Sequence, residues 1–445
     1  ARPADAAWHA DAVNVARDMR APVTEDAGQV AYWQDPTNIA GYSEYFVRKS
    51  ALKPHLPLSP LAAGVSDLAP SRLEIKLNTP FGFIDSFDFE IPRGLPLGRF
   101  DLAFAIVFLL PVGLLLLFAL LVTFERDRDM LRLVAAQAAS PRLWISARVS
   151  AILAWTVPTT AAAMIMALGI AGATPGADAA SLFLAVLITI FYTLFWSGIA
   201  LVVLARQPGA GAALGSFAAI WAVLTIGLPL AGSAISGMID PAPSPIEYVD
   251  AQRQIGDAVQ AERDEILSDA FRGRRDLQPF AERVSTLDYA TRLSFLVAET
   301  ERRLAARKAA MNDHRVRQER LAEIVGFLAP TLGVETAFAK LAGTDPARQR
   351  LFERQVRDYQ QRLRGLVYPL VQHEITQPVA PEKRPTRGRM NLAEPIALPN
   401  FALADLSPAT RNGGVLLYAG WIALMAFFAI AFGLWQIREW KVTQE

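Results

Sequence analysis

The chain has 445 residues, 52% of them hydrophobic, and a formal net charge of +1 at pH 7. The near-neutral charge provides no overall field that would attract the chain to nucleic acid, so we expect no nucleic-acid partner. Because the sequence contains no cysteine, disulfides, zinc–thiolate sites and cysteine nucleophiles are excluded. The apolar residues gather in runs of about 20 residues or more, the length that crosses a bilayer as a helix.

Residues 1–99 form the first polar segment. They open with a proline-containing stretch that has no initiator methionine, signal peptide or apolar anchor. Residues 73–77 alternate in polarity as a strand does, and residues 83–91 partly do. We therefore expect a segment of mixed α and β structure that packs against the second large polar segment.

Five apolar runs follow and predict membrane-spanning helices. They cover about residues 100–124, 144–171, 181–205, 212–239 and 414–437. A single run of this kind also fits a long core helix of a soluble protein. Five runs with so few charges are typical of a membrane protein.

Prolines and small residues mark particular places within these runs. Pro111, Pro158 and Pro229 each free a backbone carbonyl, and they are either hinges for a conformational cycle or the ordinary prolines that membrane helices tolerate. Glycine and alanine recur between Gly211 and Ala219. This pattern predicts close helix packing, within the chain or across a dimer.

The third run carries polar and aromatic side chains, Tyr192, Thr193, Trp196 and Ser197. They could line a pathway for a solute, or they could pack the bundle and anchor its interface with water. Ionisable residues are otherwise almost absent from the runs, and Asp101 lies at the outer edge of the first. Proton- and ion-coupled carriers usually bury such residues in their spans, so the sequence argues against a secondary transporter.

Basic residues in the short connections predict the orientation of the runs. Five arginines lie between Arg126 and Arg148 after the first run, Arg206 follows the third, and Arg438 and Lys441 follow the last. The connection between the second and third runs has no lysine or arginine. The basic side is therefore cytoplasmic, and both large polar segments lie outside. An odd number of spans also places the start of the sequence outside, and a sixth helix upstream is the simplest explanation.

The second polar segment, about residues 240–412, begins with a proline-rich hinge, DPAPSP. Its apolar residues recur at helical spacing in stripes that start near Ile255, Leu293, Leu321 and Phe352, with charged residues between them. These stripes predict amphipathic helices that either pack on one another with solvated faces or present a docking surface to an outer partner. A proline-rich linker follows Gln377 and leads to the last run.

Motifs of enzymes and metal sites are absent from the sequence. No G-x-x-x-x-G-K-[ST] motif occurs, so the chain has no P-loop for ATP. The four histidines, His9, His55, His314 and His373, form no H-E-x-x-H motif, and there is no methionine cluster for copper or G-x-S-x-G nucleophile. We expect no catalytic residue, metal site or cofactor on this chain, and no enzymatic activity of its own.

Two stretches, residues 57–70 (PLSPLAAGVSDLAP) and residues 98–148, resemble the permeases of ABC-2 type transporters. The narrower resemblance is to the subgroup with a large extracytoplasmic insertion, often described as multicopper-enzyme-maturation-type permeases. In this family a membrane helix ends in a glutamate-rich cytoplasmic turn, which an amphipathic helix with leucine and Ser-Pro follows. The matching positions here are Glu125, Arg126, Asp127, Leu131, Leu133, Ser140 and Pro141.

The resemblance implies that residues of about 125–143 form the coupling helix that sits in a groove of the ATPase subunit. By its charge alone, the segment is also a candidate anchor to anionic lipid. The implied fold is mainly α: a polytopic membrane helix bundle, with five spans here and six in the full chain, and a largely helical extracytoplasmic α+β domain. Its expected parts are residues 1–99 outside, 100–239 with four spans, 240–412 outside, and 413–445 with the last span and a cytoplasmic tail.

We therefore expect the permease subunit of an ATP-driven ABC transporter in the bacterial inner membrane, with its large domain in the periplasm. ATP and Mg²⁺ would bind to a separate ATP-binding subunit. The other expected partners are a second permease subunit, identical or different, membrane lipids, and a periplasmic substrate or partner protein. The alternative is an ATP-driven mechanotransmitter or assembly factor that passes no solute, and a membrane-anchored receptor without an ATPase is a third option.

Overall fold

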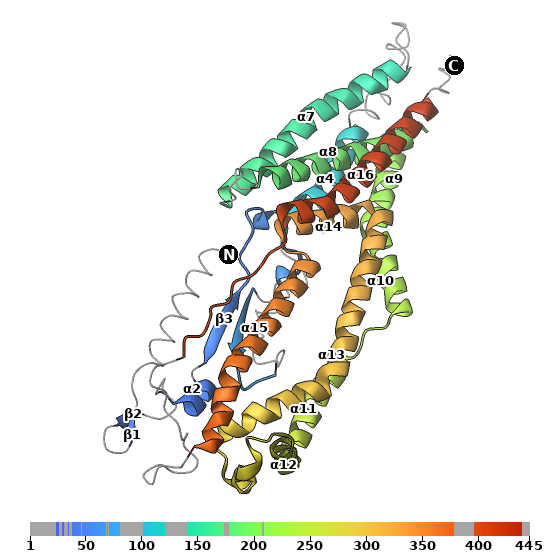
Figure 1. The fold of residues 1–445 in the computed structure, drawn as a ribbon. Coiled ribbons are helices and arrows are strands. Elements are labelled where there is room, and N and C mark those ends of the chain that lie inside the picture. The colour runs from blue at the N-terminus through green and yellow to red at the C-terminus, as the bar shows by residue number, and fades with distance from the viewer. Residues whose placement is uncertain are drawn as a thin grey trace.

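The computed structural model of the protein has a helix bundle at one end and an elongated insert at the other (Figure 1). It describes residues 24–25, 29–30, 34, 38–45, 47–67, 69, 71–80, 101–120, 141–172, 178–206, 209–377 and 396–437. The prediction of a mainly α protein is confirmed, because the strands in these parts of the chain form only two short antiparallel pairs. Residues 83–91, predicted partly as strand, lie outside the described residues.

Within its described residues, the bundle contains four helices that are long and apolar enough to cross a membrane, and one shorter apolar helix. The long ones are α7 (Pro141–Ile170), α8 (Ala179–Leu204), α9 (Ala210–Ala222) continued through the π-helical turn η8 (Val223–Gly227) into α10 (Leu228–Ile239), and α16 (Pro408–Ile437). The shorter one joins α3 (Leu102–Phe104), the π-helical turn η5 (Ala105–Leu109) and α4 (Leu110–Phe118). Residues 121–124 of the first predicted run lie outside the described residues.

Proline accounts for the π-helical turns η5 and η8. Each turn ends two residues before a proline, Pro111 in α4 and Pro229 in α10. A proline cannot donate to the carbonyl four residues earlier, and its ring crowds that carbonyl, so the helix widens just ahead of it. Pro158 lies inside α7 without such a turn.

Helices α8 and α16 form the central pair of the bundle and run parallel, in register. Ser181 Oγ donates to Asn412 Oδ1 (2.9 Å), an offset of 231 residues, and Gly198 faces Ala429 at the same offset. A Cβ on Gly198 would lie 2.6 Å from the Cβ of Ala429. The missing side chain therefore allows the two helices to approach closely.

The insert combines residues from both large polar segments. Its helices after the bundle's fourth span are α11 (Pro245–Ala261), α12 (Arg263–Gly273), the 3-10 helix η9 (Gln278–Thr286), α13 (Tyr289–Leu328), α14 (Pro330–Ala342), α15 (Pro346–His373) and the 3-10 helix η10 (Glu374–Thr376). The N-terminal elements are β1 (Thr24–Glu25), β2 (Gln29–Val30), α2 (Ile39–Tyr45), β3 (Arg48–Leu52), η1 (Ser59–Leu61), η2 (Gly64–Asp67) and β4 (Arg72–Lys76). In Figure 1, α13 runs from the far tip of the insert to the bundle.

The N-terminal elements pack against α15. Strands β3 and β4 pair antiparallel, and the strand predicted at residues 73–77 is present as β4. Ile75 and Phe352 belong to one buried cluster, and Arg364 Nε donates to Leu77 O (2.8 Å). The structure thus brings the two large polar segments together.

Helix α14 joins the insert to the bundle. Phe338 on α14 is fully buried in the core cluster that also contains the bundle helices. Thr331 Oγ1 donates to Leu224 O (2.9 Å), and Trp421 Nε1 donates to Phe327 O (2.6 Å). The bundle and the insert therefore share a hydrophobic core.

Candidate functional site

The predicted coupling segment lies largely outside the described residues. Glu125, Arg126, Asp127, Leu131, Leu133 and Ser140 all fall between residues 120 and 141, where nothing is described. Pro141 is the first residue of α7, a position that favours proline because its missing N–H has no helical partner there. The assignment of residues 125–143 as a coupling helix stays a prediction.

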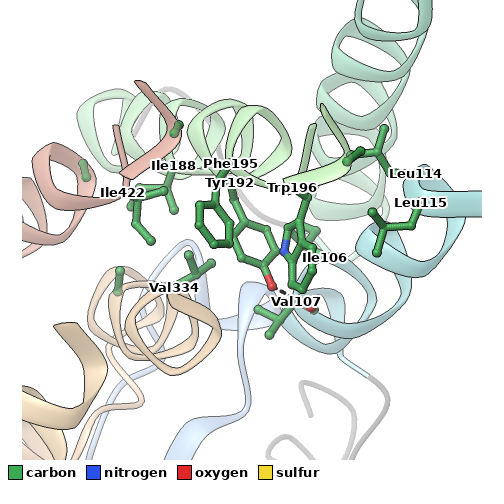
Figure 2. Packing of buried hydrophobic residues seen from close by; sticks show 14 of the residues in the cluster. Ile106, Val107, Leu114, Leu115, Ile188, Tyr192, Phe195, Trp196, Val334 and Ile422 are labelled. Atoms are coloured by element: carbon green, nitrogen blue, oxygen red, sulfur yellow. Dashed lines mark hydrogen bonds between the residues drawn. The ribbon is translucent and has the colours of Figure 1, made fainter. Parts of the chain in front are cut away.

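The four polar and aromatic side chains of the third run lie together in α8, inside the bundle core. Tyr192, Thr193, Trp196 and Ser197 are each at most 1% exposed. Figure 2 shows Tyr192 and Trp196 among apolar side chains of neighbouring helices, and their rings meet edge to face with centroids 6.2 Å apart. Their surroundings are those of a packed interior.

Three of these side chains have hydroxyl groups, and each donates to a backbone carbonyl. Thr193 Oγ1 and Ser197 Oγ each donate to the carbonyl four residues earlier, both at 2.8 Å. Tyr192 Oη donates to Val107 O at 2.8 Å (Figure 2), the carbonyl that Pro111 leaves without its helical donor. This arrangement favours bundle packing, and a role of these residues in a solute pathway stays a prediction.

An ion pair ties the N-terminal ends of α8 and α16. Asp178 caps α8 by accepting from Ser181 N (3.3 Å). Arg411, in the first turn of α16, donates to the Asp178 carboxylate and to Ser181 Oγ (3.2 Å). The two side chains are 7% and 8% exposed. A buried ion pair loses its hydration, so it is favourable only while its two groups keep good geometry. This contact therefore fixes the two helix ends relative to each other.

A second polar cluster fastens α10 to α13 where the bundle meets the insert. Asp240, directly after α10, accepts from Arg317 at 2.9 and 3.1 Å, and His314 Nδ1 lies 2.9 Å from the same carboxylate. Gln318 Nε2 donates to Asp240 O (2.8 Å), and Ser236 Oγ donates to Gln318 Oε1 (2.6 Å). The hydrogen bonds from Arg317 hold the pKa of Asp240 below its ordinary value.

Arg348, near the start of α15, joins three separate segments of the chain. It is 3% exposed and donates to Asp405 (3.0 Å), to Gly343 O (2.9 Å) and to Pro54 O (2.7 Å). Burial acts to raise the pKa of Asp405, but the hydrogen bonds and charge of Arg348 outweigh it and hold that pKa below its ordinary value. The residues just before α16 are thereby held to α15.

A buried lysine extends this network to the N-terminal segment. Lys53 Nζ donates to Gln349 Oε1 (2.5 Å). Burial, reinforced by the positive charge of Arg348, lowers the pKa of Lys53 to about 8. One polar network therefore holds together the N-terminal segment, α15 and the approach to α16.

The sequence pattern does not single out the residues of these three polar clusters, which we call the junction. Its usable signal is that Asp178 and Arg411, of opposite charge, stand just before the starts of two apolar runs. Many charges flank apolar runs in this way, and the partner of each depends on which helices are neighbours. Close contacts such as that of Gly198 with Ala429 decide which helices lie side by side. Spacing along the chain does not encode these contacts.

The charged side chains of these three polar clusters are paired within the protein. In the described parts of the chain, no group of three or more histidine, aspartate and glutamate side chains is placed to hold a metal ion. The charged side chains of the junction instead form ion pairs within the protein. The Asp240–Arg317 pair and the shared hydrophobic core connect the bundle to the insert.

Comparison with known protein families finds a match to the helical part of the insert. A family model described as "Domain of unknown function (DUF3526)" matches residues 245–376, which extend from the start of α11 to the end of η10. No curated protein and no solved structure matches the chain. The matched residues are the helices that the junction connects to the bundle.

Proposed function

We propose that this chain is the membrane-spanning permease subunit of an ATP-driven ABC transporter of the ABC-2 type. The observation that carries the proposal is the arrangement of the bundle, in which four helices have spanning length and the insert is attached at the shared outer end of α8 and α16. Helix α7 begins at Pro141 at the opposite end, next to the arginine-rich segment. The resemblance of residues 98–148 to these permeases supports the same assignment.

The proposal places the insert in the periplasm and the basic connections in the cytoplasm of a bacterial inner membrane. ATP and Mg²⁺ bind on a separate ATPase subunit, because the sequence has no P-loop. A second permease subunit completes the transporter.

In this proposal, ATP binding moves the segment of about residues 125–143 against the membrane. That segment leads directly into α7 at Pro141. The Asp178–Arg411 pair links the outer ends of α8 and α16, and α14 and the α10–α13 cluster connect the bundle to the insert. Helix α13 has 40 residues and so spans about 60 Å, which carries movement to the far tip of the insert.

Co-purification in mild detergent tests the proposal. The chain is expected to be recovered with an ATP-binding subunit, and the variants Glu125→Ala and Leu131→Ala/Leu133→Ala are expected to lose most of it. Glu247→Ala, which removes an exposed carboxylate from α11, is the matched control and should retain the ATPase. Recovery of the chain alone, or unchanged binding and transport in both coupling variants, would overturn the proposal.

A second candidate is a mechanotransmitter or assembly factor that passes no solute. The packed surroundings and satisfied hydroxyls of Tyr192, Thr193 and Ser197 favour it. Because the chain has no cysteine, Thr193→Cys can be probed with a hydrophilic thiol reagent during ATP turnover. Modification during turnover supports a solute pathway, whereas protection throughout supports force transmission. Arg362→Cys, on the exposed side of α15, is the positive control for the reagent.

A further inference from the structure

Helix α15 runs along the insert and has three chemically different sides (Figure 1). Val356 and Leu363 lie on the first side and belong to the buried cluster shared with the N-terminal elements. Arg364 lies on the second side, which faces α13, and its Nη1 is 2.9 Å from Glu301 Oε1. The third side faces neither the core of the insert nor α13, so its charged residues do not serve those contacts.

This third side borders a cavity of about 460 Å³. Among the described residues, the side chains that line it are Gln355, Asp358, Gln361 and Arg362. The volume lies within the range of small-molecule sites in proteins, about 300–1,000 Å³. Because all four side chains are polar, the cavity suits a charged solute better than an apolar one.

The two charged groups of the cavity are open to a ligand. Asp358 and Arg362 are both exposed to solvent, and within the described chain neither makes an ion pair or a side-chain hydrogen bond. An acidic residue four positions before a basic one has the favourable orientation for an ion pair on a helix. The two side chains nevertheless stay apart, so each keeps its full charge for a group that arrives from solution.

Gln355 gives the cavity a preformed wall. Its Nε2 donates to Ala404 O (2.7 Å), and its Oε1 accepts from Ala404 N (2.9 Å). The segment that contains Ala404 is itself held on α15, because the rings of Phe401 and Tyr359 meet with centroids 5.5 Å apart. The fixed amide of Gln355 keeps one N–H and one oxygen lone pair for a further partner. A side chain that is already ordered loses little entropy when a ligand binds.

The lining selects a ligand that carries charges of both signs. The Asp358 carboxylate can accept from an ammonium, and the Arg362 guanidinium can donate to a carboxylate, each through charge-assisted hydrogen bonds. Residues four apart on a helix have Cβ atoms about 5–6 Å apart, so a small molecule can reach both. The amides of Gln355 and Gln361 offer the neutral donors and acceptors that peptide groups need. An inorganic ion would satisfy only one of the two charges.

We propose that this side of α15 is a binding site for a small zwitterion, either an amino acid or a short peptide with free termini. Asp358 holds the ammonium, Arg362 holds the carboxylate, and Gln355 and Gln361 contact the groups between them. The site goes beyond the proposed function, because binding here requires neither an ATPase subunit nor transport. A failure of one proposal therefore leaves the other standing.

Titration calorimetry on the purified full chain in detergent tests the site. Alanine and tri-alanine are the probes, and N-acetyl-tri-alanine and tri-alanine amide each lack one of the two charges. We expect a free form to bind and each blocked form to bind about tenfold more weakly or less, because a lost charged partner costs about 1.4 kcal/mol or more. Tighter binding of alanine identifies an amino-acid site, and tighter binding of tri-alanine identifies a peptide site. No saturable binding of either, or equal affinity for free and blocked peptides, overturns the inference.

Variants assign each charge to its partner. Asp358→Asn should weaken tri-alanine about tenfold but leave the affinity for N-acetyl-tri-alanine unchanged, and Arg362→Gln should do the same for tri-alanine amide. General misfolding would weaken free and blocked peptides alike. Arg354→Gln, an exposed position of α15 outside the cavity lining, is the matched control and should bind as the wild type does. An Asp358→Asn protein that still prefers the free amine overturns the inference.

Protection of a thiol gives a second readout, because the native chain has no cysteine. Gln361→Cys places a thiol in the cavity and keeps both charged groups. Tri-alanine should slow its modification by a hydrophilic thiol reagent several-fold, whereas Arg354→Cys should react at the same rate with and without the peptide. Equal protection at both positions, or none at Gln361→Cys, overturns the inference.

Discussion

At the residue scale, a buried polar side chain of the bundle repairs a backbone defect. Pro111 cannot donate to the carbonyl of Val107, and the Tyr192 hydroxyl on α8 donates to it instead. An unsatisfied buried carbonyl costs about 1–3 kcal/mol. The sequence predicts both the proline and the tyrosine as notable residues of separate spans. It does not pair them, because their contact depends on the packing of α8 against η5.

The hydrogen bond between Tyr192 and the Val107 carbonyl predicts a measurable contribution to the free energy of unfolding. Tyr192→Phe is expected to lower the free energy of unfolding by about 1–3 kcal/mol, because it leaves a buried carbonyl without a donor. In a Pro111→Ala background, the new N–H at position 111 serves that carbonyl, and the same substitution should cost clearly less. Equilibrium unfolding of the four proteins in detergent measures the difference. An equal loss of unfolding free energy on Tyr192→Phe in both backgrounds would contradict the role of Tyr192 as the donor that replaces the missing N–H of Pro111.

Lys53 predicts a pH dependence of stability. Its pKa is about 8 in the folded protein against an ordinary value of 10.5. Between these pH values the unfolded chain binds more protons than the folded one, so this residue makes the protein more stable as the pH rises from about 8 to about 10.5. Lys53→Met should remove this contribution and flatten the rise of the thermal midpoint relative to the wild type. Thermal midpoints that rise equally with pH in the two proteins would contradict the lowered pKa of Lys53.

At the scale of elements, apolar length predicts where helices lie. The predicted runs 144–171 and 181–205 correspond to α7 (Pro141–Ile170) and α8 (Ala179–Leu204), because a helix of spanning length satisfies its backbone internally. The sequence does not predict that the stripes near Leu293 and near Leu321 lie on one continuous helix, α13. Charged residues join those stripes without any glycine or proline to end the helix.

The close contact of α8 with α16 yields a prediction at this scale. Gly198→Ala should destabilise the protein by about 1–3 kcal/mol, because the new Cβ would lie 2.6 Å from that of Ala429 and force the helices apart. Gly420→Ala, on an open position of α16, should instead stabilise the helix by up to about 1 kcal/mol. Thermal unfolding of both variants in the same detergent checks the opposite signs. A stabilised Gly198→Ala protein would show that the helices are not packed through this residue.

At the scale of the whole molecule, the insert and the bundle form one connected structure. Contacts between segments that lie far apart in the sequence make the junction, and they include Asp178 with Arg411 and Arg348 with Asp405. The distribution of apolar residues and arginines predicts the division of the chain into membrane spans and large polar segments. It does not predict these contacts. The sequence also predicts the fourth run, residues 212–239, and the structure has a helix of spanning length there, Ala210–Ile239. The sequence does not predict that the α10 end of this helix lies beside the charged helix α13.

The orientation of the whole molecule can be tested because the native chain has no cysteine. Arg362→Cys places a thiol on an exposed position of α15, and Gly209→Cys places one at the exposed start of α9 at the other end of the bundle. The arginine asymmetry of the connections predicts that a membrane-impermeant maleimide labels Arg362→Cys in cells with an intact inner membrane. Gly209→Cys should react only after that membrane is opened, and neither change alters the basic connections that set the orientation. Labelling of Gly209→Cys in intact cells would reverse the topology and remove the cytoplasmic site that an ATPase subunit needs.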